Sequence, residues 1–241
     1  MTHQPVRYQR TLRILSAGAA QAVTERLIQD FRRDTGSDVA AEFSAVGAMK
    51  GRITGGEAVD VIILTRAMID ELERAAFVAA GSQLDLGRVG TGVAVRAGAP
   101  VPNVASAAGL RAAVRGAAKL VCPDPAVATA GKVVLAALDR LGIADEVRGR
   151  MQYFANGYAA MGWLAAEGDV RDLGITQVTE ILPNKGVTYA GPLPDELQMK
   201  TVYSAGVAAR ALEPQLARDF VARFGLPSGQ AALLEAGYEL S

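Results

Sequence analysis

Hydrophobic positions in the first part of the chain alternate between short continuous runs and longer runs with helical spacing. The stretch "LRILSA" is a continuous apolar run typical of a buried strand, and the next segment places Val23, Leu27, Ile28 and Phe31 on one helical face. The predicted elements are strands 12–17, 38–45 and 59–65 and helices 20–35, 48–54 and 68–76. This β-α-β-α-β-α order predicts a parallel sheet with helices on its faces.

A second set of alternating patterns occupies the middle of the chain, between extended segments at 86–96 and 201–209. Its predicted elements are helices 105–114, 132–141 and 158–167 and strands 118–124, 151–156 and 172–177. A Pro- and Gly-rich passage follows this set, and helices at 213–224 and 228–236 close the chain.

Two α/β sets joined by two extended segments predict a two-lobed α/β fold with a cleft between the lobes. Each lobe is expected to contain a mostly parallel sheet flanked by helices. Residues 1–88 together with 200–241 form the predicted first lobe, and 89–199 form the second. The lobes are expected to close by bending within the extended segments, near 87–96 and 198–209.

Composition narrows the range of functions. Half of the residues are hydrophobic and only 5% are aromatic, which suits helices packed on sheets. Lys and Arg together number 25, as do Asp and Glu, so the formal net charge is zero. Because the chain has no basic block with interleaved aromatic residues, it lacks the features of a nucleic-acid-binding surface, and no nucleic-acid partner is expected.

The inventory of nucleophiles and metal ligands is short. Cys122 is the only cysteine, and its place in an apolar strand indicates a core residue. His3 is the only histidine and precedes the first predicted strand. These counts exclude metal sites built from His and Cys, Ser-His-Asp triads and Cys-His pairs. Neither a metal nor a cofactor is expected.

The N-terminal stretch "MTHQPVRYQRTLRIL" contains no apolar region of the kind found in signal peptides, and no run of eighteen apolar residues occurs elsewhere. We therefore expect a protein that does not insert into the membrane and that works in the cytoplasm, as a monomer or weak homodimer. A signal peptide that has been removed is the alternative, and it would place the protein in the periplasm.

Four loops of small, neutral residues follow predicted strands, and each opens a helix: "SAGA" (16–19), "SAVGA" (44–48), "VATAG" (127–131) and "NGY" (156–158). The start of a helix exposes unpaired backbone N–H groups and carries partial positive charge, so it can bind an anion without Arg or Lys. Small side chains would let the anion reach the backbone. Tight turns in any α/β protein also favour small residues, so packing is the alternative interpretation.

Several segments carry a family resemblance, among them "LRILSAGAAQAVTERLIQDFRRDTG", "ITGGEAVDVIIL", "DPAVATAGKVVLAALDRLGI", "LAAEGDVRDLGITQVTEI" and "GQAALLEAGYEL". They resemble the periplasmic molybdate-binding proteins, a branch of the type II periplasmic binding proteins. The resemblance runs from about residue 12 to residue 240, and it implies the type II periplasmic-binding-protein fold with a ligand between the lobes.

The resemblance also implies where ligand contacts fall. Two serine hydroxyls and a tyrosine hydroxyl help to hold the oxyanion in molybdate binders, together with backbone N–H groups. Here the first serine position falls on Ala19 and the tyrosine position on Gln177, while the second serine position falls at Val46-Gly47, with Ser44 displaced. The positions whose backbone N–H groups hold the oxyanion in that family fall here on Ala130 and Gly157. A site that keeps its N–H groups but loses these hydroxyls implies a different anion, and we expect a carboxylate.

A second group of segments resembles the subgroup of this family that includes aconitate isomerase, an enzyme that moves a double bond within a tricarboxylate. These segments are "FSAVGAMKGRI", "TGVAVRAGAPVP", "ITQVTEILPNKGV" and "GPLPDELQMKTVYSAGV". The chain departs from the subgroup at "ATAGK", where Ala130 takes the place of a residue with a hydroxyl group. The resemblance therefore does not identify the substrate.

These arguments give two sets of candidate site residues. Candidate acids or bases are Lys50, Lys132, Tyr158 and Glu180, although both lysines could equally be solvated and Glu180 could simply begin a helix. Candidate ligand-binding residues are Gly18, Ala19, Ser44, Val46, Gly47, Thr129, Ala130, Gly131, Asn156, Gly157, Gln177 and Tyr203.

The leading hypothesis is a cytosolic protein that binds a small di- or tricarboxylate between its lobes and catalyses an allylic proton shift, as the resemblance to the aconitate isomerase subgroup implies. The alternative is a solute-binding protein of an importer, which would bind molybdate or another small anion without chemistry. A sensor that closes on its ligand is a third possibility.

Overall fold

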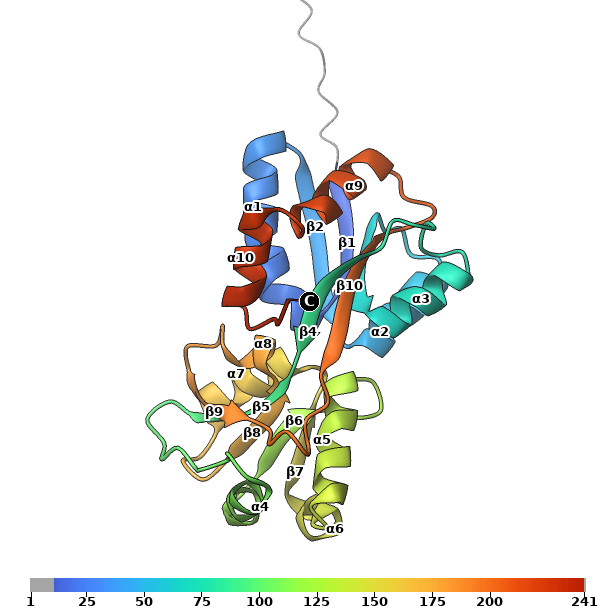
Figure 1. Cartoon of the computed structure of the whole chain (residues 1–241). Helices are drawn as coiled ribbons and strands as arrows, with labels where there is room; N and C mark the ends of the chain where they lie inside the picture. Colours follow the sequence, from blue (N-terminus) through green and yellow to red (C-terminus); the bar gives the residue numbers. More distant parts are fainter. Residues whose placement is uncertain (1–10, 241) are drawn as a thin grey trace, which may run out of the picture.

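The computed structural model describes residues 11–240, so His3 lies outside the described residues. The strands of the upper lobe in Figure 1, lobe I, are β1 (Thr11–Ala17), β2 (Asp38–Ser44), β3 (Val61–Thr65), β4 (Leu84–Val89) and β10 (Thr201–Val207). Those of the lower lobe, lobe II, are β5 (Thr91–Arg96), β6 (Leu120–Pro123), β7 (Met151–Phe154), β8 (Leu173–Gln177) and β9 (Val187–Pro192).

Helices flank both sheets. Those of lobe I are the 3-10 turn η1 (Gly18–Ala20) and α1 (Gln21–Thr35), α2 (Val46–Thr54), α3 (Arg66–Arg74), α9 (Pro214–Arg223) and α10 (Pro227–Glu235). Those of lobe II are α4 (Ala107–Gly116), α5 (Thr129–Arg140), α6 (Ala144–Val147), the 3-10 turn η2 (Arg148–Arg150), α7 (Gly157–Glu167) and α8 (Val178–Ile181). The predicted two-lobed α/β fold is confirmed.

Each five-stranded sheet combines a parallel part with an antiparallel part. The strand orders are β2-β1-β3-β10-β4 in lobe I and β7-β6-β8-β5-β9 in lobe II. Strands β1, β2 and β3 pair in parallel, as do β6, β7 and β8. The antiparallel pairs involve β10 with β3 and β4, and β5 with β8 and β9. They arise because the chain passes between the lobes twice in opposite directions.

The two connections between the lobes touch each other. Gly90 joins β4 to β5, and residues 193–200 join β9 to β10. Gln198 accepts a hydrogen bond from the Thr91 backbone N–H through Oε1 (2.8 Å) and donates one through Nε2 to the Thr91 carbonyl (2.8 Å). A Cβ on Gly90 would lie 3.3 Å from this Nε2, so the glycine leaves room for the contact.

The apolar helix faces predicted from spacing are buried. Val23, Leu27 and Phe31 of α1 all face the core, and the Phe31 ring packs edge-on against Phe220 of α9 with centroids 5.3 Å apart. Cys122 is fully buried in the core of lobe II. Each lobe therefore has its own hydrophobic core, and within residues 11–240 no cluster of buried hydrophobic side chains spans both lobes.

The structure differs from the sequence prediction at three kinds of element. Strand β9 lies in the Pro- and Gly-rich passage, and because its residues are only partly buried, no apolar run marks it. Helices α2 and α5 begin at Val46 and Thr129 rather than at 48 and 132, since their first turns consist of small residues without apolar spacing. Helices α6 and α8 are too short to show a helical period.

A buried aspartate precedes the third parallel strand of each lobe. Asp60, directly before β3, accepts hydrogen bonds from the backbone N–H groups of Arg13 (2.8 Å), Leu212 (2.7 Å) and the residue after Leu212 (3.0 Å). Asp172, directly before β8, accepts one from the Lys119 N–H (3.0 Å). These carboxylates pair with partly buried backbone donors of segments that are distant in the sequence.

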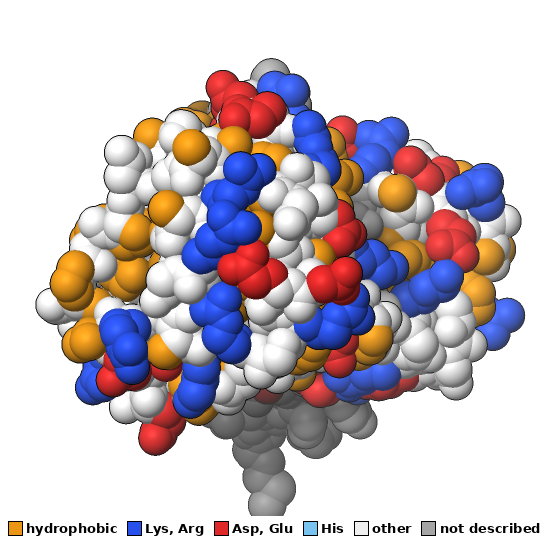
Figure 2. Space-filling model, turned by 90° about the horizontal axis from the view of Figure 1, so that it is seen from below, with side chains coloured by type: hydrophobic (Ala, Val, Ile, Leu, Met, Phe, Trp, Pro, Cys, Tyr) orange, Lys and Arg blue, Asp and Glu red, His pale blue; other side chains and the backbone are white. Residues whose placement is uncertain are grey.

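The surface carries charges of both signs. On the face seen in Figure 2, basic and acidic side chains are interspersed, with scattered hydrophobic side chains between them. Within residues 11–240, no helix combines the length and the apolar character needed to cross a membrane.

The buried position of Asp60 predicts a large effect on stability. Asp60→Ala would leave three backbone N–H groups without their acceptor, and we expect the free energy of unfolding to fall by about 3 kcal/mol or more. Urea denaturation followed by circular dichroism would measure the change. Asp145→Asn, at a side chain that is 91% exposed, is the control and should change the free energy by less than about 0.5 kcal/mol. A loss of similar size in both variants would contradict the role given to Asp60.

Candidate ligand-binding site

A small pocket lies where the two lobes meet. It is bordered by the ends of β1, β2, β6 and β8, by the segments that follow them, by the start of α7 and by β10. The lining residues are Ala17, Gly18, Ala19, Ser44, Ala45, Val46, Pro123, Ala128, Thr129, Ala130, Asn156, Gly157, Gln177, Glu180 and Tyr203. Its free space of about 20 Å³ is enough for a water molecule. Ligands of open α/β sheets bind in this position, outside the carboxyl ends of the strands.

Three of the longer helices begin at the pocket, α2, α5 and α7, and the four-residue α8, with Glu180 in its first turn, begins there as well. The first turns of the three longer helices differ from that of α8. None of the three has an acidic residue in its first turn, and no side chain caps the start of α2 or α5. Asn156 caps α7, with Oδ1 accepting from the Ala159 N–H (2.8 Å). In α5 the N–H of Lys132 donates to the Ala128 carbonyl, so the three preceding N–H groups have no partner within the helix. These helix starts concentrate partial positive charge around the pocket.

The glycines beside the pocket allow close contacts. A Cβ on Gly131 would collide with the backbone carbonyl of Pro123, so this glycine lets α5 pack against the end of β6. A Cβ on Gly157 would collide with the Glu180 carboxylate. Packing therefore accounts for Gly131, whereas the neighbouring Ala130 lines the pocket itself.

Glu180 of α8 places a buried carboxylate at the pocket wall. Its Oε2 accepts a hydrogen bond from the Thr176 hydroxyl (2.6 Å), and its Oε1 accepts one from the Gly157 N–H (3.1 Å). Oε1 also lies against Gly18 of lobe I, where an added Cβ would be 2.9 Å away. Burial raises the pKa of the Glu180 carboxyl to about 7, although the hydrogen bonds from Thr176 and Gly157 favour the ionised form.

Gln177, at the end of β8, presents an unpaired donor. Its side chain is almost fully buried, and its Oε1 accepts a hydrogen bond from the Tyr203 hydroxyl (2.6 Å). Within the described part of the chain, Gln177 Nε2 has no hydrogen-bond partner. A buried, unpaired amide N–H lowers stability, and a ligand oxygen in the pocket would satisfy it.

Polar contacts cross from one lobe to the other around the pocket. The Gly47 N–H at the start of α2 donates to the Val127 carbonyl of lobe II (3.2 Å). Tyr203 of β10 donates to Gln177 of β8. The lobes are thus closed on each other, and a ligand larger than water requires them to move apart.

The pocket brings together most of the predicted site residues. Those that line it are Gly18, Ala19, Ser44, Val46, Thr129, Ala130, Asn156, Gly157, Gln177, Glu180 and Tyr203. The predicted residues outside its lining are Gly47, Gly131, Tyr158, Lys50 and Lys132. Lys50 forms an ion pair with Glu71 of α3 (2.6 Å), and Lys132 is exposed. Tyr158 is hydrogen-bonded to the backbone of Ala22 in lobe I, and burial raises its pKa.

Four lining residues are not among the predicted site residues: Ala17, Ala45, Pro123 and Ala128. Each stands at a strand end or just before a helix start. Their apolar or small side chains carry no chemical signal. Ala17, Ala45 and Ala128 lie within the small-residue loops, and only that position could have identified them.

Within residues 11–240, no group of three or more His, Cys, Asp or Glu side chains is arranged to hold a metal ion. Cys122 lies in β6, and burial raises the pKa of its thiol to about 12, so it stays protonated near neutral pH.

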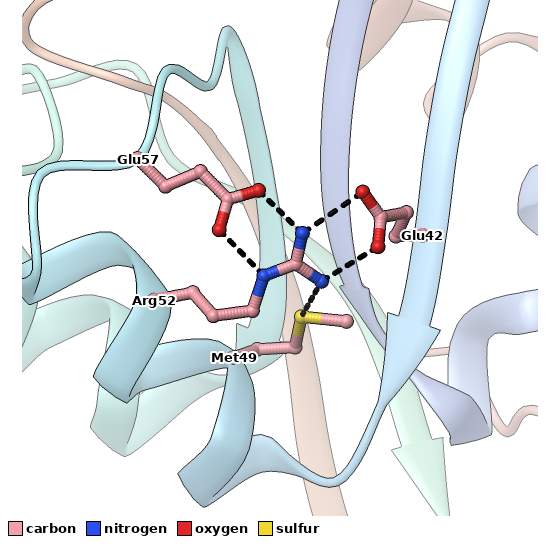
Figure 3. A network of polar contacts seen from close by, with 4 residues as sticks. All are labelled: Glu42, Met49, Arg52 and Glu57. Atoms are coloured by element: carbon pink, nitrogen blue, oxygen red, sulfur yellow. Dashed lines mark hydrogen bonds and ion pairs between the residues drawn. The ribbon is translucent and has the colours of Figure 1, made fainter.

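A network of ion pairs holds α2 against β2 (Figure 3). Arg52 of α2 forms two hydrogen bonds to the Glu42 carboxylate of β2 (both 2.8 Å) and two to that of Glu57, one of them 2.6 Å long. The hydrogen bonds with Arg52 hold the pKa of both carboxyls below the usual range. The network fixes α2 relative to β2, whose last residue, Ser44, lines the pocket.

Comparison with known proteins shows similarity over nearly the whole chain. An aconitate isomerase from a Pseudomonas species is 26% identical over 232 residues, which cover 94% of this chain and 87% of the relative. The periplasmic molybdate-binding protein of Azotobacter vinelandii superimposes with a TM-score of 0.81 at 20% identity, covering 95% of this chain and 99% of that one. The sulfate-binding protein SubI from Mycobacterium tuberculosis does so with a TM-score of 0.73 at 16% identity, covering 95% and 86%.

The fold is therefore that of the periplasmic binding proteins, as the resemblance of the sequence to molybdate-binding proteins implied. The profile of the bacterial extracellular solute-binding protein family matches residues 12–239, which is almost the entire described structure. The chain belongs to the family of bacterial extracellular solute-binding proteins.

Proposed function

We propose that this chain binds a small carboxylate anion, a di- or tricarboxylate, in the pocket between its lobes. The unpaired Nε2 of Gln177 carries the proposal, because this buried donor lies beside helix starts that offer further N–H groups. The lining contains no Lys or Arg within the described residues, so the anion would be held by neutral donors. Ser44 and Thr129 also line the pocket, and their hydroxyls could donate to the anion.

A carboxylate is favoured over molybdate by the residues at two positions. Ala19 and Gln177 occupy places where molybdate binders use hydroxyl groups, if the resemblance is carried over position by position. The similarity to an aconitate isomerase also favours a polycarboxylate.

Catalysis is the second candidate function, and Glu180 is the observation that favours it. Of the four candidate acids and bases, Glu180 alone lines the pocket. A carboxyl with a pKa of about 7 can both accept and return a proton near neutral pH. In an allylic shift, the ionised carboxylate would take a proton from the carbon next to the double bond, and the N–H groups would stabilise the resulting charge. Glu180 would then return a proton at the other end of the allylic system.

A ligand screen tests both candidates. Isothermal titration calorimetry with trans-aconitate, succinate, sulfate and molybdate should show stronger binding of the carboxylates than of molybdate. Incubation with trans-aconitate, followed by proton NMR, would detect the cis isomer. Binding of trans-aconitate without isomerisation would support the solute-binding role and rule out the catalytic one. Submicromolar binding of molybdate would overturn the carboxylate assignment.

Ala130→Asp tests whether the start of α5 holds the anion. We expect binding to be lost, because a fixed negative charge would stand in the pocket, whereas an acidic residue in the first turn of a helix is neutral or favourable for stability. Ala108→Asp is the matched control, since Ala108 is also the second residue of its helix, α4, and is exposed away from the pocket. Calorimetry measures binding and circular dichroism measures folding. Undiminished binding by a folded Ala130→Asp protein would show that the anion does not sit at α5.

Gln177→Met tests the unpaired donor. Methionine keeps the volume of the side chain but removes the N–H, and one hydrogen bond to a charged ligand is worth about 1.5 to 3 kcal/mol. We therefore expect trans-aconitate to bind tenfold to a hundredfold more weakly. Tyr203→Phe, which removes the hydroxyl that orients the amide, should weaken binding by less. If Gln177→Met binds as tightly as the wild type, the amide does not contact the ligand.

A further inference from the structure

The carboxylate of Glu180 lies at the wall of a pocket that otherwise offers hydrogen-bond donors to an anion. Its partners are the Thr176 hydroxyl and the backbone N–H groups of Gly157 and Gln177, and within residues 11–240 no Lys or Arg forms an ion pair with it. An anion bound beside ionised Glu180 would place two negative charges in a buried site, where Coulomb repulsion is screened much less than in water.

The neighbours of Glu180 cannot relieve this repulsion by supplying a positive charge. The ionisable groups that interact with it are all phenols, and burial raises the pKa of each: Tyr158 of α7, Tyr203 of β10 and Tyr238 near the C-terminus. Phenols with raised pKa values stay neutral around pH 7.

The charged groups of the remaining elements that pack against α8 are engaged elsewhere. On α1, Arg26 pairs with Glu235 and Glu25 faces Tyr158. On β5, Arg96 donates to the Gly168 carbonyl. Strand β9 contributes only the phenol of Tyr189, and β8 and η1 contain no ionisable side chain.

We propose that Glu180 takes up one proton when an anion binds in the pocket, so that anion and proton enter the site together. This rests on the proposed anion-binding function. The proton comes from solvent and forms an O–H bond on the carboxylate, which removes the second negative charge. The new O–H is also a donor for the anion. In the allylic shift described above, only complexes in which Glu180 is still ionised can take a proton from the ligand, and the higher proton affinity makes Glu180 a stronger base in those complexes.

The coupling gives anion binding a defined pH dependence. Where free Glu180 is ionised and bound Glu180 is protonated, the affinity falls by up to about tenfold for each unit of pH increase. The decline begins near the pKa of the free carboxyl, about 7. Glu180→Gln carries no titratable group, and its amide can still accept from Gly157 and donate to Thr176, so its affinity should not change with pH.

Calorimetry on the wild-type protein measures the proton directly. We would titrate trans-aconitate and sulfate at pH 8 in two buffers of different ionisation enthalpy, since both probes are fully ionised there. The wild type should take up between about half a proton and one proton per anion. Glu180→Gln should take up none, and Glu167→Gln, an exposed carboxylate on α7, should match the wild type.

A second measurement needs no ligand. Because the folded pKa of Glu180 is raised to about 7, its contribution to stability is greatest at low pH and is lost as the pH rises through 7. The Tm of the wild type should therefore fall relative to that of Glu180→Gln between pH 5 and pH 8. This readout is independent of any effect of the substitution on binding.

These measurements distinguish proton uptake by Glu180 from anion binding itself. Binding without proton uptake by the wild type would overturn the coupling and leave the anion site intact. Absence of binding by either probe from pH 6 to pH 9 would overturn the anion site and the coupling with it. Equal proton uptake by the wild type and a folded Glu180→Gln would assign the proton to another group.

Discussion

The first backbone N–H groups of α2, α5 and α7 cannot be paired within their own helices, and the site depends on this constraint. The three helices start at the same pocket, with no acidic first turn to neutralise them. Small residues let these starts approach the strand ends, as at Gly131 against Pro123. The pocket thereby acquires positive potential from the backbone rather than from Lys or Arg. A site of this kind selects anions by geometry, because backbone donors cannot move independently of the fold.

Two side chains modify this backbone site. Tyr203 fixes the oxygen of the Gln177 amide on the lobe I side, which leaves Nε2 free. Glu180 has the opposite character, since it brings an acceptor into a pocket of donors. It is held there by its own contacts with Thr176 and Gly157. The balance of donors and acceptors in the pocket therefore depends on the Tyr203–Gln177 hydrogen bond and on whether Glu180 is protonated.

Periodicity in the sequence predicted the architecture, because each buried strand and amphipathic helix carries its own local pattern. The pocket loops could also be predicted, since carboxyl ends of parallel strands meet at one edge of a sheet. The lysines show the limit of this reasoning. The predicted starts at 48 and 132 would put Lys50 and Lys132 in first turns, but α2 and α5 begin earlier, and neither lysine lines the pocket. The opposing roles of Gln177 and Glu180 depend on the four-residue α8, which has no detectable period.

The strand order of lobe I has a consequence for how the chain assembles during synthesis. Lobe II is built from one continuous stretch, β5 to β9, whereas β10 must return to lie between β3 and β4. Contacts between segments so far apart in sequence form slowly. A nascent chain that has not reached residue 201 can complete the sheet of lobe II, while β4 lacks β10, its one partner among the described strands, and β3 exposes an open edge. Lobe I is therefore the part that a ribosome-bound chain leaves open to misassembly.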